Sequence, residues 1–321
     1  MRNLQYLALA ILALAIELIP ARPQAEPWPQ RPVRIILPLP TGGGTDLAAR
    51  LFAEGLSKRW SQPVIVENRP GADGIVGVTS FVSARDGHTL LFSFAGPISI
   101  NPLVYEKLPY DPEHDLVPIA SAVDNFFAIA VSRSLGVDSM RAFVDLARGQ
   151  PGKLNWAATP GLPQYIFAAL EKNAGIKMTQ VPYRDFAPAL QDFAKDRVQV
   201  AVTSPSYLLP LVAAGTARFL MVTNRERSPV APDAPTAAEA GFPELLFEGV
   251  VGFYGWRDMP AALRERIAGD IAAVATDPQI AARLREVGVV VRSSTSAEFA
   301  AAIAEQKAKV RPLVETARPQ R

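Results

Sequence analysis

Three consecutive glycines followed by a threonine and an aspartate, Gly42 to Asp46, are the residues with the clearest chemistry in this sequence of 321 residues. The apolar run Val33–Leu39 before them is typical of a strand, and Asp46–Trp60 after them has the apolar spacing of a helix. Glycines leave backbone N–H groups uncovered, and the start of a helix adds unpaired donors with a partial positive charge. The segment therefore predicts a loop that binds a carboxylate or phosphate, with Thr45 as the helix N-cap. Taken alone, it fits a simple capped turn equally well.

A second glycine-containing segment, Gly71-Ala72-Asp73-Gly74, follows the next predicted strand, Val64–Glu67. Neighbouring parallel strands that each end in such a turn form a crevice at the carboxyl edge of a sheet, where open α/β sheets bind ligands. Arg69 is interpreted as a solvated or structural residue, and Asp73 as a helix cap whose charge points away from the crevice. The two loops together favour an anion site at this edge.

The composition excludes several kinds of catalytic site. The sequence has no cysteine and two histidines, which excludes disulfides, thiol nucleophiles, iron–sulfur clusters and Cys- or His-rich metal sites. No G-x-S-x-G pentapeptide marks a hydrolase nucleophile, and neither His88 nor His114 lies in a segment typical of a catalytic triad. With 33 Lys and Arg against 31 Asp and Glu, the chain lacks the basic excess of a nucleic-acid-binding protein. We expect no catalytic residues, no metal site and no cofactor.

Predicted strands and helices alternate along the rest of the chain. Further strands are predicted at 89–94, 126–132, 154–158, 198–204, 219–223, 249–256 and 289–292, and further helices at 140–148, 164–173, 187–194 and 261–275. Two capping boxes, Thr236-x-x-Glu239 and Thr295-x-x-Glu298, each predict the start of a helix. The alternation indicates an α/β protein with two mostly parallel sheets covered on both faces, and the length fits two domains.

The N-terminus has the order of a secretory signal peptide. Arg2 is followed by an apolar run from Leu4 to Ile16 and by the small residues Ala21 and Ala25. As a helix this run would extend about 20 Å, which is short of the ~30 Å core of a bilayer. We therefore predict a signal peptide over residues 1–25, export to the periplasm, and no membrane span elsewhere.

A series of short motifs, in order along the chain, resembles one family. They are W-P-Q-R-P-V-R from Trp28, the Gly42–Asp46 loop, V-E-N-R-P-G-A from Val66, D-G-H-T-L-L from Asp86, N-P from Asn101, L-P-Y-D-P from Leu108, P-G-K-L-N from Pro151, V-P-Y-R from Val181, A-P-A-L from Ala187 and P-T-A-A-E-A-G from Pro235. From about Trp28 to its C-terminus, the chain is identified by these motifs as a member of the Bug-type extracytoplasmic solute receptors, the substrate-binding proteins of tripartite tricarboxylate transporters.

The resemblance implies a type II periplasmic-binding-protein-like fold, in which two α/β lobes joined by hinge strands enclose a ligand cleft. By this analogy residues 26–125 and 249–321 form lobe 1, and residues 126–248 form lobe 2. The resemblance also implies a monomeric receptor, not an enzyme, that binds a small carboxylate and delivers it to membrane permease subunits.

The same resemblance carries over a set of ligand-binding positions, to which Leu39 and Thr41 are added as an apolar wall and a hydroxyl. In lobe 1 the carried-over positions are Gly42, Gly43, Gly44 and Thr45 of the first loop, Gly71, Ala72 and Gly74 of the second, and Ser93, Phe94 and Ala95 at the end of the third strand. In lobe 2 they are Thr159, Pro160, Gly161 and Leu162 of the loop across the cleft, and Thr203 and Ser204 at a strand end.

Departures from the family pattern bear on the ligand. Thr203 stands where many members carry Asp, so the ammonium group of an amino acid would lack a carboxylate partner there. Apolar side chains near the predicted cleft favour an acid with an aliphatic or aromatic body; they are Leu39, Phe94, Leu162 and Tyr165. We predict a mono- or dicarboxylate rather than an amino acid.

Two alternatives stay open at this point. A receptor of this kind can present its ligand to a membrane sensor instead of a permease. A secreted α/β hydrolase is the less favoured alternative, because the nucleophile motif is missing.

Overall fold

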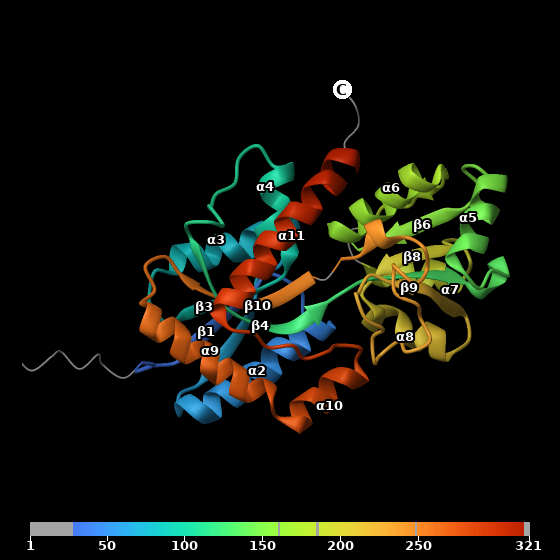
Figure 1. The fold of residues 1–321 in the computed structure, drawn as a ribbon. Helices are drawn as coiled ribbons and strands as arrows, with labels where there is room; N and C mark the ends of the chain where they lie inside the picture. The colour runs from blue at the N-terminus through green and yellow to red at the C-terminus, as the bar shows by residue number, and fades with distance from the viewer. Residues whose placement is uncertain (1–27, 160, 184–185, 248, 318–321) are drawn as a thin grey trace, which may run out of the picture. The chain divides into compact units, whose positions relative to one another are not determined.

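The computed structural model describes residues 28–159, 161–183, 186–247 and 249–317, which form two five-stranded sheets with helices on both faces (Figure 1). The predicted signal peptide, residues 1–25, lies outside the described residues. In the part of the chain that the structure describes, no helix combines the length and the apolar character needed to cross a membrane.

The first sheet has the strand order β2 (Val64–Asn68), β1 (Val33–Leu37), β3 (Thr89–Ser93), β10 (Gly249–Trp256) and β4 (Leu116–Asn125). Strand β1 pairs in parallel with β2 and β3, whereas β10 pairs antiparallel with β3 and β4. Four strands thus run in one direction and β10 runs in the other. The prediction of a mostly parallel sheet is confirmed in this mixed form.

The second sheet repeats the arrangement, with the strand order β7 (Thr179–Gln180), β6 (Asn155–Ala158), β8 (Val200–Thr203), β5 (Ala128–Ser132) and β9 (Ala217–Val222). Here β6 is parallel to β7 and β8, and β5 is antiparallel to β8 and β9. Each sheet therefore contains one strand, β10 or β5, that is antiparallel to its neighbours. Each of these strands is the first one that the chain forms after it crosses from the other sheet.

Helices cover both faces of each sheet, as Figure 1 shows. On the first sheet, α3 (Ile75–Ala84) and α11 (Ser296–Ala317) share one buried apolar cluster, while α2 (Gly44–Trp60) packs with α9 (Ala261–Ala275) and α10 (Pro278–Glu286). On the second sheet, α5 (Met140–Gly149) and α6 (Leu162–Ala174) cover one face, and α7 (Phe186–Ala194) and α8 (Pro205–Ala213) cover the other. Shorter helical turns are α4 (Asn101–Val104), η1 (Ala72–Gly74), η2 (Gly96–Ile100), η3 (Arg133–Leu135) and η4 (Pro243–Leu245).

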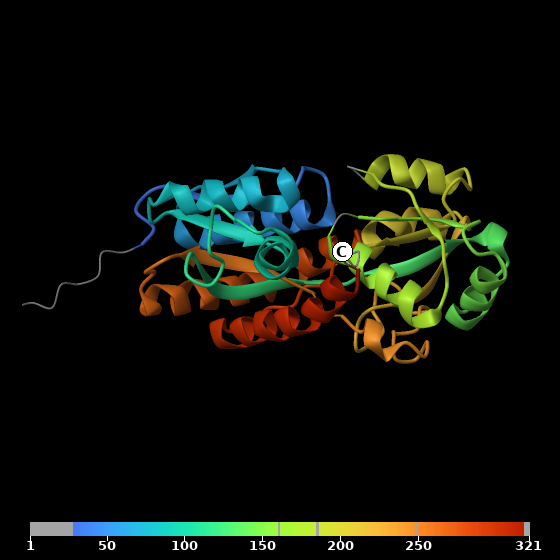
Figure 2. The same ribbon diagram turned by 90° about the horizontal axis from the view of Figure 1, so that it is seen from above.

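The chain crosses from the first sheet to the second between β4 and β5, where Phe126 and Phe127 are both buried (Figure 2). It returns through residues 223–247 to β10. Helix α11 also joins the two halves, because its last turns pack on α6, and Val310 and Val314 belong to the second sheet's apolar cluster. Within the described part of the chain, these segments link the two sheets.

Some expectations about local structure are corrected. No strand forms at 289–292, where Val291 makes only an isolated bridge to Val123, and β4 was not predicted at all. Thr236 and Glu239 make both hydrogen bonds of a capping box, at 2.8 and 3.2 Å, yet only turns follow. The box at Thr295 and Glu298 does open a helix, α11.

Candidate functional site

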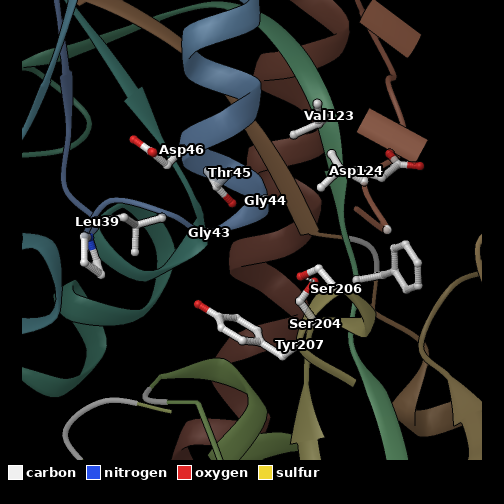
Figure 3. A pocket seen from close by; sticks show the side chains of 14 residues that line it. Leu39, Gly43, Gly44, Thr45, Asp46, Val123, Asp124, Ser204, Ser206 and Tyr207 are labelled. Atoms are coloured by element: carbon white, nitrogen blue, oxygen red, sulfur yellow. Dashed lines mark hydrogen bonds between the residues drawn. The ribbon is translucent and has the colours of Figure 1, made fainter. Parts of the chain in front are cut away.

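A small pocket of about 70 Å³ lies where the N-terminus of α2 faces the N-terminus of α8 (Figure 3). A volume of this size accommodates a few water molecules. Its lining comes from both sheets: Leu39, Pro40, Gly43, Gly44, Thr45, Asp46, Val123, Asp124, Phe126, Ser204, Ser206, Tyr207, Gly288 and Val289. The two helix N-termini place unpaired backbone donors and partial positive charge on opposite walls of the pocket.

The first wall is the glycine loop that precedes α2. The helix begins at Gly44 with Gly43 in the N-cap position and no side-chain cap, so the prediction that Thr45 caps the helix is wrong. The helix starts two residues earlier than its apolar pattern indicates, which moves Thr45 into the first turn. A Cβ on Gly44 would lie 2.6 Å from Cγ2 of Val289, so the close approach of the 288–289 segment requires glycine here.

Asp46 stabilises this loop through hydrogen bonds to its carboxylate. Its carboxylate accepts hydrogen bonds from the Gly42 amide at 3.0 Å, from Asn68 Nδ2 at 2.8 Å, and from two nitrogens of Arg50 at 3.0 and 3.1 Å. Burial alone would raise the pKa of Asp46, but the hydrogen bonds from Arg50, Gly42 and Asn68 together keep it below its ordinary value. The acid is therefore ionised, paired and structural.

The second wall is the start of α8. Ser204 occupies the N-cap position and Pro205 the first helical position, which suits proline because its missing N–H would be unpaired there. The hydroxyls of Ser204 and Ser206 lie 3.0 Å apart. The ring of Tyr207 packs edge-on against Phe186 of α7, with centroids 5.7 Å apart.

The second acidic residue that lines the pocket, Asp124, also forms an ion pair with an arginine. Its Oδ1 lies 3.0 Å from Nε of Arg292, in the segment that follows the 288–289 turn. Figure 3 shows the carboxylates of Asp46 and Asp124 pointing away from the hydroxyls of Thr45, Ser206 and Tyr207. Neither negative charge is therefore aimed at the space between the two helix N-termini.

No lysine, arginine or histidine is among the described residues that line the pocket. The groups that face it are hydroxyls and helix-start amides, which are neutral hydrogen-bond donors. Such a site can bind an anion through fixed dipoles rather than through an ion pair. Among the described residues, no group of three or more His, Asp and Glu side chains is arranged to hold a metal ion.

Five of the residues selected from the sequence line this pocket: Leu39, Gly43, Gly44, Thr45 and Ser204. Gly42 lines an adjoining hollow with Gly43, Gly44, Leu47, Ser206, Tyr207 and Val287. Thr41 is exposed and lines neither. Their role in ligand binding stays a prediction.

The second glycine loop and the end of β3 lie outside the pocket. Gly71, Ala72 and Gly74 form or flank the short helix η1, and a Cβ on Gly74 would lie 2.6 Å from Pro97, which indicates a packing role. Asp73 accepts a hydrogen bond from Tyr105 Oη at 2.7 Å. The residues Ser93, Phe94 and Ala95 are absent from the pocket lining, and the Phe94 ring lies against Gly96.

Most of the ligand-binding residues predicted in the second half of the molecule also lie outside the pocket. The Thr159 amide donates to the Val202 carbonyl, and Leu162 is buried in the apolar cluster under α6. Pro160 lies outside the described residues, and Gly161 does not line the pocket. Thr203 is fully buried, and its hydroxyl has no hydrogen-bond partner within the described part of the chain.

Several lining residues were not selected from the sequence: Pro40, Asp46, Val123, Asp124, Phe126, Ser206, Tyr207, Gly288 and Val289. Ser206 and Tyr207 had a usable signal, since Ser204-Pro205 after an apolar strand is a typical helix start. Asp124 and Val289 had none, because their place beside the glycine loop depends on the pairing of β4 and on a turn far along the chain.

Comparisons with known proteins agree with this fold. A family model described as the tripartite tricarboxylate transporter family receptor matches residues 48–318. A UPF0065 protein of Bordetella bronchiseptica is 32% identical over 315 residues, covering 97% of this chain and 92% of the relative.

Two of the similar solved structures illustrate the match, and each covers 90% of this chain. The R. palustris protein Rpa4515 with adipate is 28% identical, with a TM-score of 0.81 and 98% of its own chain covered. The periplasmic binding protein BugD is 25% identical, with a TM-score of 0.78 and 98% covered. These similarities confirm the periplasmic-binding-protein-like fold expected from the sequence motifs.

Proposed function

Since the chain belongs to the receptor family of the tripartite tricarboxylate transporters, we propose that it is a periplasmic receptor that captures a small carboxylate and delivers it to a membrane permease of that type. A member of this family is a binding protein and not an enzyme. The observation that carries the proposal is the pocket between two helix N-termini, lined by hydroxyls, with both of its acids paired to arginines and turned away.

The ligand class follows from the same groups. Neutral donors on two opposed walls suit a carboxylate, and apolar lining from Leu39, Val123 and Val289 suits an aliphatic or aromatic body. Both acids of the lining pair with arginines, so neither offers an unmatched charge to an ammonium group. This supports a mono- or dicarboxylate over an amino acid, and the adipate bound by the R. palustris relative belongs to this class.

We also propose that the two sheets define two lobes, residues 26–125 with 249–321 and residues 126–248, which separate to admit the ligand. The crossings at 125–128 and 223–249 support such a hinge. The small volume of the pocket supports opening as well, because a dicarboxylate is larger than a few water molecules. The packing of α11 on α6 restricts the motion to one that keeps this contact.

Isothermal titration of the protein purified from the periplasm tests the proposal, with adipate, succinate, hexanoate and benzoate against aspartate and glutamate. We expect saturable binding of at least one non-amino acid. A ligand at 100 times its Kd should also raise the unfolding free energy by about 2.7 kcal/mol. Tight binding of aspartate or glutamate, with the other acids inert, would contradict the ligand class.

Transport and sensing are separated in a deletion strain. Loss of uptake of the labelled acid supports delivery to a permease. Unchanged uptake with loss of the transcriptional response to the acid would instead identify a ligand-presenting receptor for a membrane sensor.

A further inference from the structure

Tyr207 is the side chain that spans the pocket from one wall to the other. It is the third residue of α8, on the second sheet, yet it lines both the pocket and the adjoining hollow beside the glycine loop. A Cβ built on Gly43 would lie only 3.6 Å from its phenol oxygen. Figure 3 shows this oxygen directed toward the Leu39–Gly43 side of the pocket.

The Tyr207 ring has a packing partner on its own sheet. The backbone N–H of Tyr207 donates to the Ser204 carbonyl at 3.1 Å, and the ring packs edge-on against Phe186, which is only 3% exposed. The side chain itself remains 36% exposed. The ring therefore has a contact on its own sheet, and its hydroxyl lies at the pocket.

The polar groups of the pocket fall into two sets. The amides at the start of α2 and the Thr45 hydroxyl come from the first wall, and the hydroxyls of Ser206 and Tyr207 come from the second. When the proposed lobes separate to admit a ligand, the Tyr207 hydroxyl moves off the glycine loop with its own wall, and a carboxylate at the first wall then directs the rest of its molecule toward the second. A phenol hydroxyl can donate a hydrogen bond to an anionic or hydroxyl oxygen.

We propose that Tyr207 is a specificity-determining residue, whose hydroxyl donates to a second oxygen-bearing group of the ligand and so favours a dicarboxylate over the monocarboxylate of equal length. This inference rests on the proposed carboxylate-binding function. Because a hydrogen bond to a charged group is worth about a ten- to hundredfold change in affinity, the preference should be measurable.

The test uses Tyr207→Phe, which keeps the ring against Phe186 and removes only the hydroxyl. The probes are two matched pairs, adipate with hexanoate and succinate with butyrate, measured by titration calorimetry. For the better-bound pair we expect the wild-type protein to bind the dicarboxylate at least tenfold more tightly. In Tyr207→Phe this ratio should fall at least tenfold, while the Kd of the monocarboxylate stays within about twofold.

Tyr183→Phe is the matched control, because it removes a phenol that lies between β7 and α7, donates to Asp192 at 2.7 Å and does not line the pocket. The preference of Tyr183→Phe for the dicarboxylate over the matched monocarboxylate should equal that of the wild-type protein. Tyr207→Leu also lacks a hydrogen-bond donor, so it replaces Tyr207→Phe if that variant does not fold.

The outcomes distinguish the two proposals. If the wild-type protein binds none of the four acids, the proposed function fails and the inference fails with it. If the wild type binds them but Tyr207→Phe leaves the ratio unchanged, or weakens both members of a pair equally, only the role of Tyr207 is overturned.

Discussion

Asp46 and Arg50, one helical turn apart at the start of α2, form a two-point ion pair, with Oδ1–Nη2 of 3.0 Å and Oδ2–Nε of 3.1 Å. The same carboxylate accepts the Gly42 amide, so the pair ties the glycine loop to the helix that follows it. Arg50 also donates to Asn68 Oδ1 at 2.8 Å, which links the loop to β2. The glycine-loop wall of the pocket is therefore held in shape by a carboxylate of the protein itself.

Replacement of this acid by Asp46→Asn should lower the unfolding free energy at neutral pH by about 1–2 kcal/mol, because a buried carboxylate loses its charge while its partner Arg50 is half exposed and screened by solvent. The folded-state pKa of Asp46 lies below its ordinary 3.8. Its stabilising contribution is thus complete above that pH and is lost as the pH falls through the lowered value. Denaturant unfolding at several pH values should show the difference between the wild-type protein and Asp46→Asn shrinking as the pH falls below 3.8.

Asp145→Asn is the control for this measurement, since it breaks a pair with Arg148 whose side chains are more than half exposed. It should change stability by less than about 1 kcal/mol at any pH. A constant difference between wild type and Asp46→Asn down to pH 2 would contradict a lowered pKa.

Gly44→Ala should weaken ligand binding at least tenfold, because its Cβ would lie 2.6 Å from Val289 Cγ2 and would push the 288–289 segment from the pocket wall. The double variant with Val289→Ala should recover most of the affinity, since the colliding methyl group is then absent. Gly149→Ala, at an open position with nothing within 4 Å, is the matched control and should bind normally. An unrecovered double variant would show that Gly44 acts through something other than this contact.

Arg292→Gln should weaken carboxylate binding about five- to tenfold, because it removes the guanidinium that matches the charge of Asp124 beside the pocket. Adding Asp124→Asn should restore the affinity. Arg257→Gln breaks a pair of nearly the same exposure, with Asp115, and serves as the control. If the double variant binds as weakly as Arg292→Gln, the charge of Asp124 is not the cause.

Ligand affinity should depend only weakly on salt. No cationic side chain is among the described lining residues, and the whole chain carries a net charge of only +2, so screening removes little of the attraction. We expect the Kd to change less than about threefold between 0.05 and 0.5 M NaCl in titration calorimetry. A tenfold loss over that range would indicate an ion pair with the ligand.

The first glycine loop shows how much of the site could be predicted from a short stretch of sequence. An apolar run, three glycines and a helical pattern specify a strand, a turn and a helix start without reference to any other segment, and Gly43, Gly44 and Thr45 do line the pocket. The second loop has the same local signature. Its glycines nevertheless pack against Pro97 and Val76, because local geometry does not determine which surface a turn will meet.

The sequence by itself determined the α/β class, the alternation of elements and one wall of the pocket, since these depend on the spacing of apolar residues and on glycine over short stretches. Only the tertiary structure decided the other wall. Tyr207, Asp124 and Val289 come from three distant segments, and their meeting depends on strand pairing and on the crossings between the sheets. Such long-range contacts arise from the packing of whole elements, for which no single stretch of sequence carries a signal.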